Sequence, residues 1–296
     1  MTEPPSASAE PIGFIGLGTM GRPMARRLRA RGENLVVWTR TRSKAADIAD
    51  DRVRFASDVA DVARSCRVVL SCLLDDAAIE DVYLGPDGVI ANAAAGSLLV
   101  EHGTFTPALA RRLDSAAADS SIQFLDAPVS GGAAGAAAGN LVTMVGGTPD
   151  AVARLAPVAS AYCTLVERIG PSGAGVTLKL VNQMLVAANV VSTVEAAAVI
   201  RAAGISVDAA ERVLTGGWAA SAMLARNLRA AVTGEFPAEG AGIGAMADVL
   251  ALAREVVRSL GVPTVLEPLV YAQFVSSSRS GFAEHDLSAL PLTPGR

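Results

Sequence analysis

Short apolar runs alternate with amphipathic segments along about the first 130 residues of the chain. The apolar runs that predict strands lie at 12–15, 35–38, 68–74, 97–101 and 122–129. The segments that predict helices lie near 44–50, 58–64, 76–83 and 106–118, and a further helix carrying Met20, Met24 and Leu28 follows the first strand. The run VVLSCLL is apolar throughout, as expected of a parallel strand buried on both faces. This alternation predicts a doubly wound α/β sheet.

The pattern changes near residue 172, after which no further strand is predicted. One long apolar segment, 174–203, reads as a single helix that ends at Gly204. Shorter helices are predicted near 207–215, 219–232, 243–260 and 264–278. We therefore expect a disordered tail over residues 1–10, a nucleotide-binding domain over 11–172 and an all-helical domain over 173–296.

The long helix carries apolar residues on more than one face, namely Leu178, Val181, Leu185, Val186, Val190, Val194 and Val199. A helix that is apolar all round is usually buried. We expect it to pack between the domains and against a second subunit, so the protein should be a homodimer or homotetramer.

Composition narrows the class of protein. The chain has 296 residues, 51% of them hydrophobic and 18% charged, with a net charge of -4 and no basic block. These values predict a globular protein that does not bind nucleic acid. Mean hydropathy is +0.40, but it comes largely from alanine. Polar residues interrupt the longest apolar run, so no membrane span is expected; they are Asn182, Gln183, Asn189 and Glu195.

The first ten residues, MTEPPSASAE, lack the basic start and apolar run of a secretion signal. The three cysteines, Cys66, Cys72 and Cys163, show no metal-binding spacing. Reduced thiols, a cytoplasmic location and no metal site are therefore expected.

Gly16, Gly18 and Gly21 form a GxGxxG pattern that follows a predicted strand and opens a predicted helix. In that context the pattern is typical of a dinucleotide site. The glycines permit a tight turn and close approach of a pyrophosphate, which the helix amides then face. A glycine turn of another α/β protein is the less favoured alternative. The expected cofactor contacts in the turn are Gly16, Leu17, Gly18, Thr19, Met20 and Gly21.

The end of the second strand bears on the choice between NAD and NADP. An NAD site usually has an acidic residue there to bind the ribose hydroxyls, whereas this chain has Thr39 in the segment VVWTRTRSK. A cationic cluster suits a 2′-phosphate, because arginine can hold it with two hydrogen bonds. NADP is therefore preferred over NAD, although a solvated charged loop is the alternative. The expected contacts are Thr39, Arg40, Thr41 and Lys44, with Arg42 nearby.

A second glycine-rich segment, FLDAPVSGGAAGAAAGNLVTMVGG, spans 124–147. After the strand that is expected to end at Val129, Ser130, Gly131 and Gly132 offer a hydroxyl and exposed backbone N–H groups. Such groups can bind an anion, here a substrate carboxylate. A flexible surface loop is an equally good interpretation of these three residues alone.

Lys179 lies in the segment GAGVTLKLVNQ, 173–183, and is one of two lysines among 25 basic residues. On a helix, Lys179 and Gln183 share one face, with Asn182 beside them. Burial can lower a lysine pKa toward neutrality, whereas arginine stays protonated. Lys179 is therefore the candidate proton donor to a carbonyl oxygen during hydride reduction, and the base in the reverse reaction. The alternative is a lysine that extends from an amphipathic helix into solvent.

These segments resemble the β-hydroxyacid dehydrogenase family, the relatives of 3-hydroxyisobutyrate dehydrogenase. GFIGLGTMGRPMA resembles the cofactor motif, DAPVSGGAAGAAAGNLVTMVGG the substrate motif, and GAGVTLKLVNQ the catalytic helix in an Asn-Gln form; GFAEHDLSAL, with Asp286 and Ser288, resembles the family's C-terminal segment. The resemblance implies a Rossmann domain, a long connecting helix and a helical second domain, in a dimer or tetramer. It also implies a small aldehyde, keto acid or 3-hydroxy acid as substrate.

Carried over by position, the resemblance makes Lys179 catalytic, places substrate at Ser130, Gly131 and Gly132, and gives Asn182 and Gln183 a part in holding it. It also places the nicotinamide ribose against Leu73, Leu74 and Thr104, and assigns Asp248 to the cofactor.

The chain departs from the family pattern in two places. An Asp-x-Ser-Thr segment is replaced by EHGT at 101–104, and a Lys-Asp-Leu segment of a late helix by Ala247-Asp248-Val249. The missing lysine leaves the substrate open. Trp218 either adds a wall to the active site or packs as an ordinary helix residue. An imine reductase and a non-catalytic dinucleotide-binding protein are the alternatives to a dehydrogenase.

Overall fold

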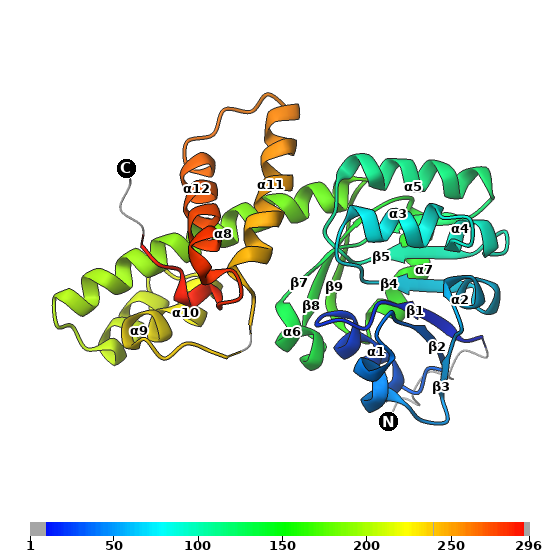
Figure 1. Ribbon diagram of the computed structural model, residues 1–296, viewed down its shortest axis with the longest axis horizontal. Coiled ribbons are helices and arrows are strands. Elements are labelled where there is room, and N and C mark those ends of the chain that lie inside the picture. The colour runs from blue at the N-terminus through cyan, green and yellow to red at the C-terminus, as the bar shows by residue number, and fades with distance from the viewer. Residues whose placement is uncertain (1–9, 239, 293–296) are drawn as a thin grey trace. The chain divides into compact units, whose positions relative to one another are not determined.

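A computed structural model describes residues 10–238 and 240–292 of the chain, apart from the side chain of Lys44. The tail expected at 1–10 falls almost wholly outside these residues. The chain divides into two compact units, with the division between Lys179 and Leu180 (Figure 1).

The first unit is built on a nine-stranded sheet with the order β3-β2-β1-β4-β5-β6-β8-β7, in which β9 pairs with β8. Its strands are β1 Ile12–Ile15, β2 Leu35–Trp38, β3 Val53–Phe55, β4 Val68–Ser71, β5 Leu98–Glu101, β6 Gln123–Asp126, β7 Val129–Ser130, β8 Leu141–Gly146 and β9 Cys163–Gly170. The pairs from β3 to β6 are parallel, and β8 is antiparallel to β6 and β7. This is the predicted doubly wound sheet with a mixed edge.

Helices cover both faces of this sheet (Figure 1). They are α1 Gly21–Ala30, the 3-10 helix Arg42–Ile48, α2 Val59–Ser65, α3 Asp76–Leu84, α4 Val89–Asn92, α5 Pro107–Asp119, α6 Gly132–Ala138 and α7 Pro149–Ala159. Side chains alternate between the faces along each strand, since successive residues point in opposite directions. Phe14 of β1 joins α1, α6 and α7 in one apolar core, while its neighbour Ile15 joins α2 to α5 in the other.

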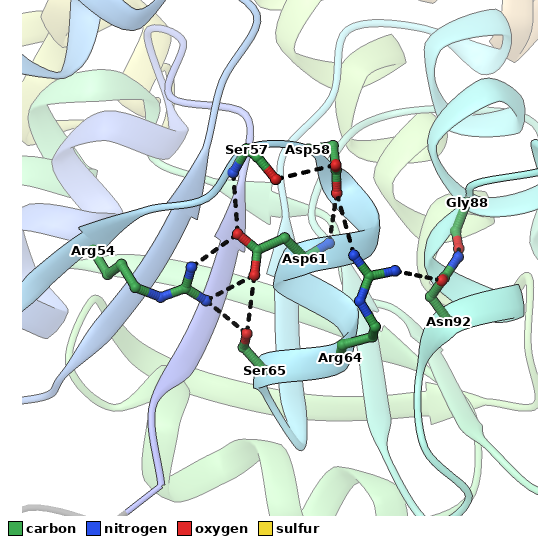
Figure 2. Close-up of polar contacts among 8 residues, drawn as sticks. All are labelled: Arg54, Ser57, Asp58, Asp61, Arg64, Ser65, Gly88 and Asn92. Atoms are coloured by element: carbon green, nitrogen blue, oxygen red, sulfur yellow. Dashed lines mark hydrogen bonds and ion pairs between the residues drawn. The ribbon is translucent and has the colours of Figure 1, made fainter.

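The amino end of α2 is held by the polar network in Figure 2, which joins β3, α2 and α4. Asp58 caps the helix by accepting from the Asp61 amide at 2.7 Å. The Asp61 carboxylate accepts hydrogen bonds from both terminal nitrogens of Arg54, at 2.8 and 3.0 Å. Arg64 donates to Asn92 at 2.8 Å and so connects α2 to α4. These contacts hold the outer strand β3 against the helical layer.

Two sequence predictions in this unit were wrong in detail. The strand expected over 122–129 is two strands, since Pro128 has no N–H and interrupts the ladder. The strand expected over 68–74 ends at Ser71, because the Leu73 amide donates to the Glu101 carboxylate instead of a neighbouring strand. The elements β3, α4, α6, α7, β8 and β9 were not predicted.

The second unit is helical in its described residues, as predicted. The long helix α8, Ala174–Ala202, begins in the first unit and ends in the second; α9 Val207–Gly216, α10 Ala222–Thr233, α11 Ile243–Ser259 and α12 Glu267–Ser277 follow, with short turns of helix at Ser278–Phe282 and Leu287–Ala289. Val190 and Val194 of α8 pack with Leu228 and Phe274 in the core of this unit. The Arg226 guanidinium pairs with the buried carboxylate of Asp286, which also accepts from Ser288.

By length and composition α8 could cross a membrane, with 29 residues and a mean hydropathy of 1.6 in an 18-residue window, of which 33% is buried. Val176 of its first turn packs in the core of the first unit, and its later residues pack in the core of the second. These contacts make α8 a structural helix of both units.

Candidate active site

The glycine turn joins β1 to α1. Gly16 has a φ of +89°, and a Cβ there would lie 2.5 Å from the Cys72 carbonyl oxygen, so a side chain is excluded. Gly18 and Thr19 are exposed, whereas Leu17 is buried. No side chain caps the amino end of α1, and its first turn holds no acidic residue. The uncapped amides of a ten-residue helix behind a bare glycine turn fit a dinucleotide pyrophosphate.

Thr39, Arg40 and Thr41 follow β2 directly, at the carboxyl edge of the parallel strands. Arg40 is exposed. The guanidinium of Arg42 lies 5.0 Å from the centre of the Phe55 ring and is oriented by that contact. The side chain of Lys44 lies outside the described residues.

Leu73, Leu74 and Thr104 follow the neighbouring strands β4 and β5 at the same edge. Leu74 is 82% exposed, and Leu73 and Thr104 are partly buried. The fully buried carboxyl of Glu101 accepts hydrogen bonds from the amides of Leu73 and Gly103. Sequence reasoning passed over Glu101, although an acidic residue ending an apolar strand was a signal that could have found it.

Ser130 ends β7, and Gly131 and Gly132 then adopt φ values of +131° and +66° with both residues exposed. The backbone leading to Ser130 is fixed from two sides. The Nδ1 atom of His102 lies 2.7 Å from the Ala127 carbonyl oxygen, to which the Thr143 hydroxyl also donates at 3.0 Å. Burial lowers the His102 pKa to about 4, so the ring is neutral near pH 7.

Asp126, the last residue of β6, caps the helix that carries Lys179. Its fully buried carboxyl accepts from the amides of Gly173 at 2.8 Å and Val176 at 2.9 Å. These amides lie at the start of α8 and have no partner within the helix. A Cβ on Gly175 would lie 2.6 Å from the Asp126 carbonyl oxygen, so helix and strand meet backbone to backbone. Sequence reasoning missed this cap.

Lys179 lies in the second turn of α8 and is 8% exposed. Burial lowers the pKa of its amine to about 8, and nearby Cys72 opposes part of that shift. An amine with this pKa changes charge close to neutrality, which arginine cannot do. Because Lys179 is buried, the alternative of a lysine that extends from the helix into solvent is wrong. Cys72 is a free, partly buried thiol, and Cys66 and Cys163 are free and buried.

The other proposed substrate residues, Asn182 and Gln183, lie in the second unit. The Asn182 amide donates to the Gln183 side chain at 3.1 Å. Asp248 is exposed on α11, next to Ala247, which is buried in the helical core. Trp218 is fully exposed in the segment after α9, so it does not pack as an ordinary core residue.

Comparison with known proteins decides the family. Residues 11–170 match the NAD binding domain of 6-phosphogluconate dehydrogenase, and residues 173–291 match the NAD-binding domain of NADP-dependent 3-hydroxyisobutyrate dehydrogenase. The chain belongs to the β-hydroxyacid dehydrogenase family. The resemblance inferred from the motifs is thereby confirmed, together with the Rossmann-type and helical architecture.

Individual relatives agree with this assignment. An NAD-dependent L-serine dehydrogenase of Pseudomonas aeruginosa is 33% identical over 288 residues, which cover 94% of this chain and 96% of the relative. A crystal structure of 3-hydroxyisobutyrate dehydrogenase from Salmonella typhimurium is 27% identical with a TM-score of 0.85, and covers 95% of this chain and 98% of that one. A structure of Psf3 in complex with NADP+ and 2-OPP is 28% identical with a TM-score of 0.85, covering 94% and 97%.

A β-hydroxyacid dehydrogenase with this glycine turn is an NAD(P)-dependent oxidoreductase that acts on CH–OH groups. Relatives of this chain thus include both a protein named for NAD and a protein that binds NADP+.

Proposed function

We propose that this protein is an NADP-preferring dehydrogenase or reductase of a small carboxylate-bearing 3-hydroxy acid or of the matching aldehyde or keto acid. The buried amine of Lys179, with a pKa of about 8, carries this proposal. Reduction of a carbonyl needs a proton at the oxygen, and a general acid is most effective when its pKa is near the working pH.

The cofactor and the site residues have separate roles in this reaction. The nicotinamide supplies or accepts the hydride when the cofactor is bound. Lys179 donates a proton from Nζ to the substrate oxygen in reduction and removes it in oxidation. The hydroxyl of Ser130 and the backbone N–H groups of Gly131 and Gly132 hold the carboxylate. Asn182 and Gln183 hydrogen bond to the remaining polar groups of the substrate.

NADP preference rests on the residues that follow β2. Thr39 stands where an acid would select the ribose hydroxyls of NAD. Arg40 is exposed, and Arg42 is oriented on Phe55. Two guanidinium groups beside one ribose favour a 2′-phosphate, because each can form paired hydrogen bonds with it. Lys44, in the same segment, adds a third positive charge.

The activity is tested by NADPH oxidation with a panel of small aldehyde acids, keto acids and imines. We expect turnover with carboxylate-bearing carbonyl compounds. Activity confined to imines would make the protein an imine reductase, and no turnover with any member would favour a non-catalytic binding protein.

Lys179 is tested in the same assay with two variants. Lys179→Ala should lower turnover by about 10² to 10⁴, the usual range for a lost general acid. Lys179→Arg keeps the charge, but a guanidinium gives up its proton too reluctantly, so this variant should fail nearly as badly. Both should still bind NADPH. If Lys179→Arg keeps most of its turnover, the lysine only orients or neutralises the substrate.

Cofactor preference is tested by measuring the affinities of NADPH and NADH. We expect a preference for NADPH of more than about tenfold, since losing paired phosphate contacts costs roughly 1.4 kcal/mol or more. Arg40→Asp should weaken or invert it. Arg67→Asp makes the same charge change just before β4, at the amino ends of the parallel strands and so away from the glycine turn. It should leave the ratio of the NADPH and NADH affinities unchanged. Equal affinities in the unmodified protein would contradict the proposal.

We also propose that the protein is a homodimer or homotetramer in the cytoplasm. The three free cysteines suit a reducing compartment. Leu185 and Val199 of α8 are 62% and 66% exposed in the single chain, and Val265 and Leu266 before α12 are 84% and 63% exposed. Leu185, Val265 and Leu266 line an apolar cavity of about 320 Å³. Large exposed apolar surfaces of this kind mark protein interfaces.

Light scattering at micromolar concentration tests the assembly. Leu185→Glu with Val265→Glu should give a folded monomer, because two carboxylates would be buried in the interface without partners. A matched double change of exposed apolar residues away from the cavity, Ile205→Glu with Val213→Glu, should leave the oligomer intact. A monomeric unmodified protein would contradict the proposal.

A further inference from the structure

Glu101 is an unusual residue for the end of a buried strand. Its side chain is fully buried, although glutamate is rarely buried without partners. The carboxyl accepts hydrogen bonds from the Ser71 hydroxyl on Oε2 and from the amides of Leu73 and Gly103 on Oε1, the latter two at 3.1 and 2.6 Å. The Ser71 hydroxyl in turn contacts the hydroxyl of the buried Tyr83.

The two amides on Oε1 come from different loops. Leu73 lies just after β4, and Gly103 lies two residues after the end of β5. One oxygen atom therefore ties together the loops that follow two neighbouring parallel strands. Ligands of open α/β sheets bind outside this carboxyl edge. The next residues of these loops are Leu74 and Thr104, which the resemblance to the family places against the nicotinamide ribose.

Gly103 leaves room for this arrangement. A Cβ on Gly103 would lie 2.7 Å from Oε1 of Glu101 and 2.6 Å from the Leu73 carbonyl oxygen. Both separations are shorter than real Cβ contacts, so no side chain fits at position 103 while the carboxyl holds the two loops together. The glutamate at 101 and the glycine at 103 are thus matched in size.

We propose that Glu101 and Gly103 form a size-matched positioning pair that sets the nicotinamide end of the cofactor site. This rests on the proposed function, since it assumes that the loops after β4 and β5 contact the nicotinamide half. The pair acts through the Leu73 and Thr104 segments and does not itself touch the reacting atoms. The pair requires a side chain at position 101 that is as long as glutamate and that carries an acceptor oxygen at Oε1. Burial also raises the pKa of the Glu101 carboxyl, so a neutral acceptor of the same length should serve.

The test measures dissociation constants for NADPH and for 2′,5′-ADP, a fragment that lacks the nicotinamide half. Glu101→Asp is one methylene too short to reach both amides, and should weaken NADPH binding by about tenfold, close to the loss of one ordinary hydrogen bond. Glu101→Gln keeps the length and the Oε1 acceptor, and should bind NADPH within about twofold of the unmodified protein. All variants should bind the fragment as the unmodified protein does.

A double change tests whether the two residues are coupled. Gly103→Ser alone should also weaken NADPH binding, because its Cβ meets the carboxyl and Leu73. Glu101→Asp with Gly103→Ser removes the carboxyl from that space and releases the Leu73 loop, so the double variant should lose less affinity than the product of the single losses. Should Glu101→Asp fail to fold, Gly103→Ala replaces it, with a similar loss expected for NADPH alone.

Several results would overturn the pair. NADPH binding unaffected by Glu101→Asp, or by its replacement Gly103→Ala, would show that the loops are set by other contacts. Equal losses in Glu101→Gln and Glu101→Asp would assign the effect to charge and not to length. Parallel losses for the fragment would indicate general damage to the fold, and a double variant that is simply additive would deny the coupling. If the protein binds NADH instead, the same series with NADH and ADP tests the pair while the NADP preference fails separately.

Discussion

The cap that Asp126 places on α8 gives the sharpest structural prediction, because it links a strand of the first unit to the helix of Lys179. The perturbation is Asp126→Asn. The carboxyl accepts the amide of Gly173 on Oδ1 and the amide of Val176 on Oδ2. An asparagine can keep one of these bonds, but it turns an N–H₂ group toward the other amide.

The magnitude follows from the burial of these groups. A buried amide without a partner costs about 1–3 kcal/mol. The carboxylate at a helix amino end adds roughly 0.3–1 kcal/mol through the helix dipole. Together these losses give about 1–4 kcal/mol for Asp126→Asn, which corresponds to a fall in melting temperature of roughly 2–16 °C for a domain of this size. Asp126→Ala leaves both amides unpaired and should cost about 2–6 kcal/mol.

The helix amino end also sets the position of Lys179, which lies five residues after Ala174 and so about 7.5 Å along the axis. A displaced amino end moves the amine away from the substrate oxygen, and misplacement of about 1 Å can cost about 10²-fold in rate. We therefore expect turnover to fall by about tenfold or more in Asp126→Asn. Cofactor affinity should hold, because the glycine turn is on another part of the sheet.

The assay combines thermal unfolding followed by circular dichroism with steady-state kinetics and cofactor titration. Asp114→Asn is the matched control, since burial also raises the pKa of the Asp114 carboxyl but this side chain forms no hydrogen bond with the other residues that the structure describes. That variant should be close to the unmodified protein in all three measurements. A melting temperature and turnover unchanged by Asp126→Asn would refute the cap as the anchor of the catalytic helix.

Three further predictions concern pH and stability. With a Lys179 pKa of about 8, the rate of carbonyl reduction should fall about tenfold per pH unit above pH 8 and the oxidation rate should rise up to that pH; flat profiles from pH 6 to 10 would contradict the proton-transfer role. The pKa of His102 is about 4 in the fold, against 6.5 unfolded, so the unfolded chain binds more protons between these values and stability falls on acidification. Urea unfolding at pH 7 and pH 4.5 should show that the unmodified protein loses about 2–3 kcal/mol more than His102→Gln, and equal losses would be the opposite result. Arg54 lowers the pKa of Asp61 to about 2 (Figure 2), so its stabilisation is present above pH 3.8 and is lost toward pH 2; Arg54→Met should cost about 0.5–1 kcal/mol at pH 7 and less near pH 2, as measured by the same unfolding method.

Local patterns in the sequence determined much of this protein. The glycine turn, the apolar strands β1, β2 and β5 and the long helix α8 were predicted within a few residues, because turn chemistry and hydrophobic periodicity are set by near neighbours. Lys179 was singled out because it is one of two lysines in an arginine-rich chain. The same periodicity missed β8, since its apolar residues lie within the glycine- and alanine-rich segment 124–147.

The tertiary structure decided how the chemical groups are held. Asp126 caps a helix whose first amides are 47 and 50 residues away, and no spacing rule connects such distant positions. Glu101 has its meaning only because folding brings Leu73 of the neighbouring loop to its carboxyl. The shift of the Lys179 pKa likewise depends on burial that is complete only in the fold. Sequence determines local geometry through torsion angles and side-chain periodicity, whereas desolvation and hydrogen bonding between distant segments exist only once the chain has packed.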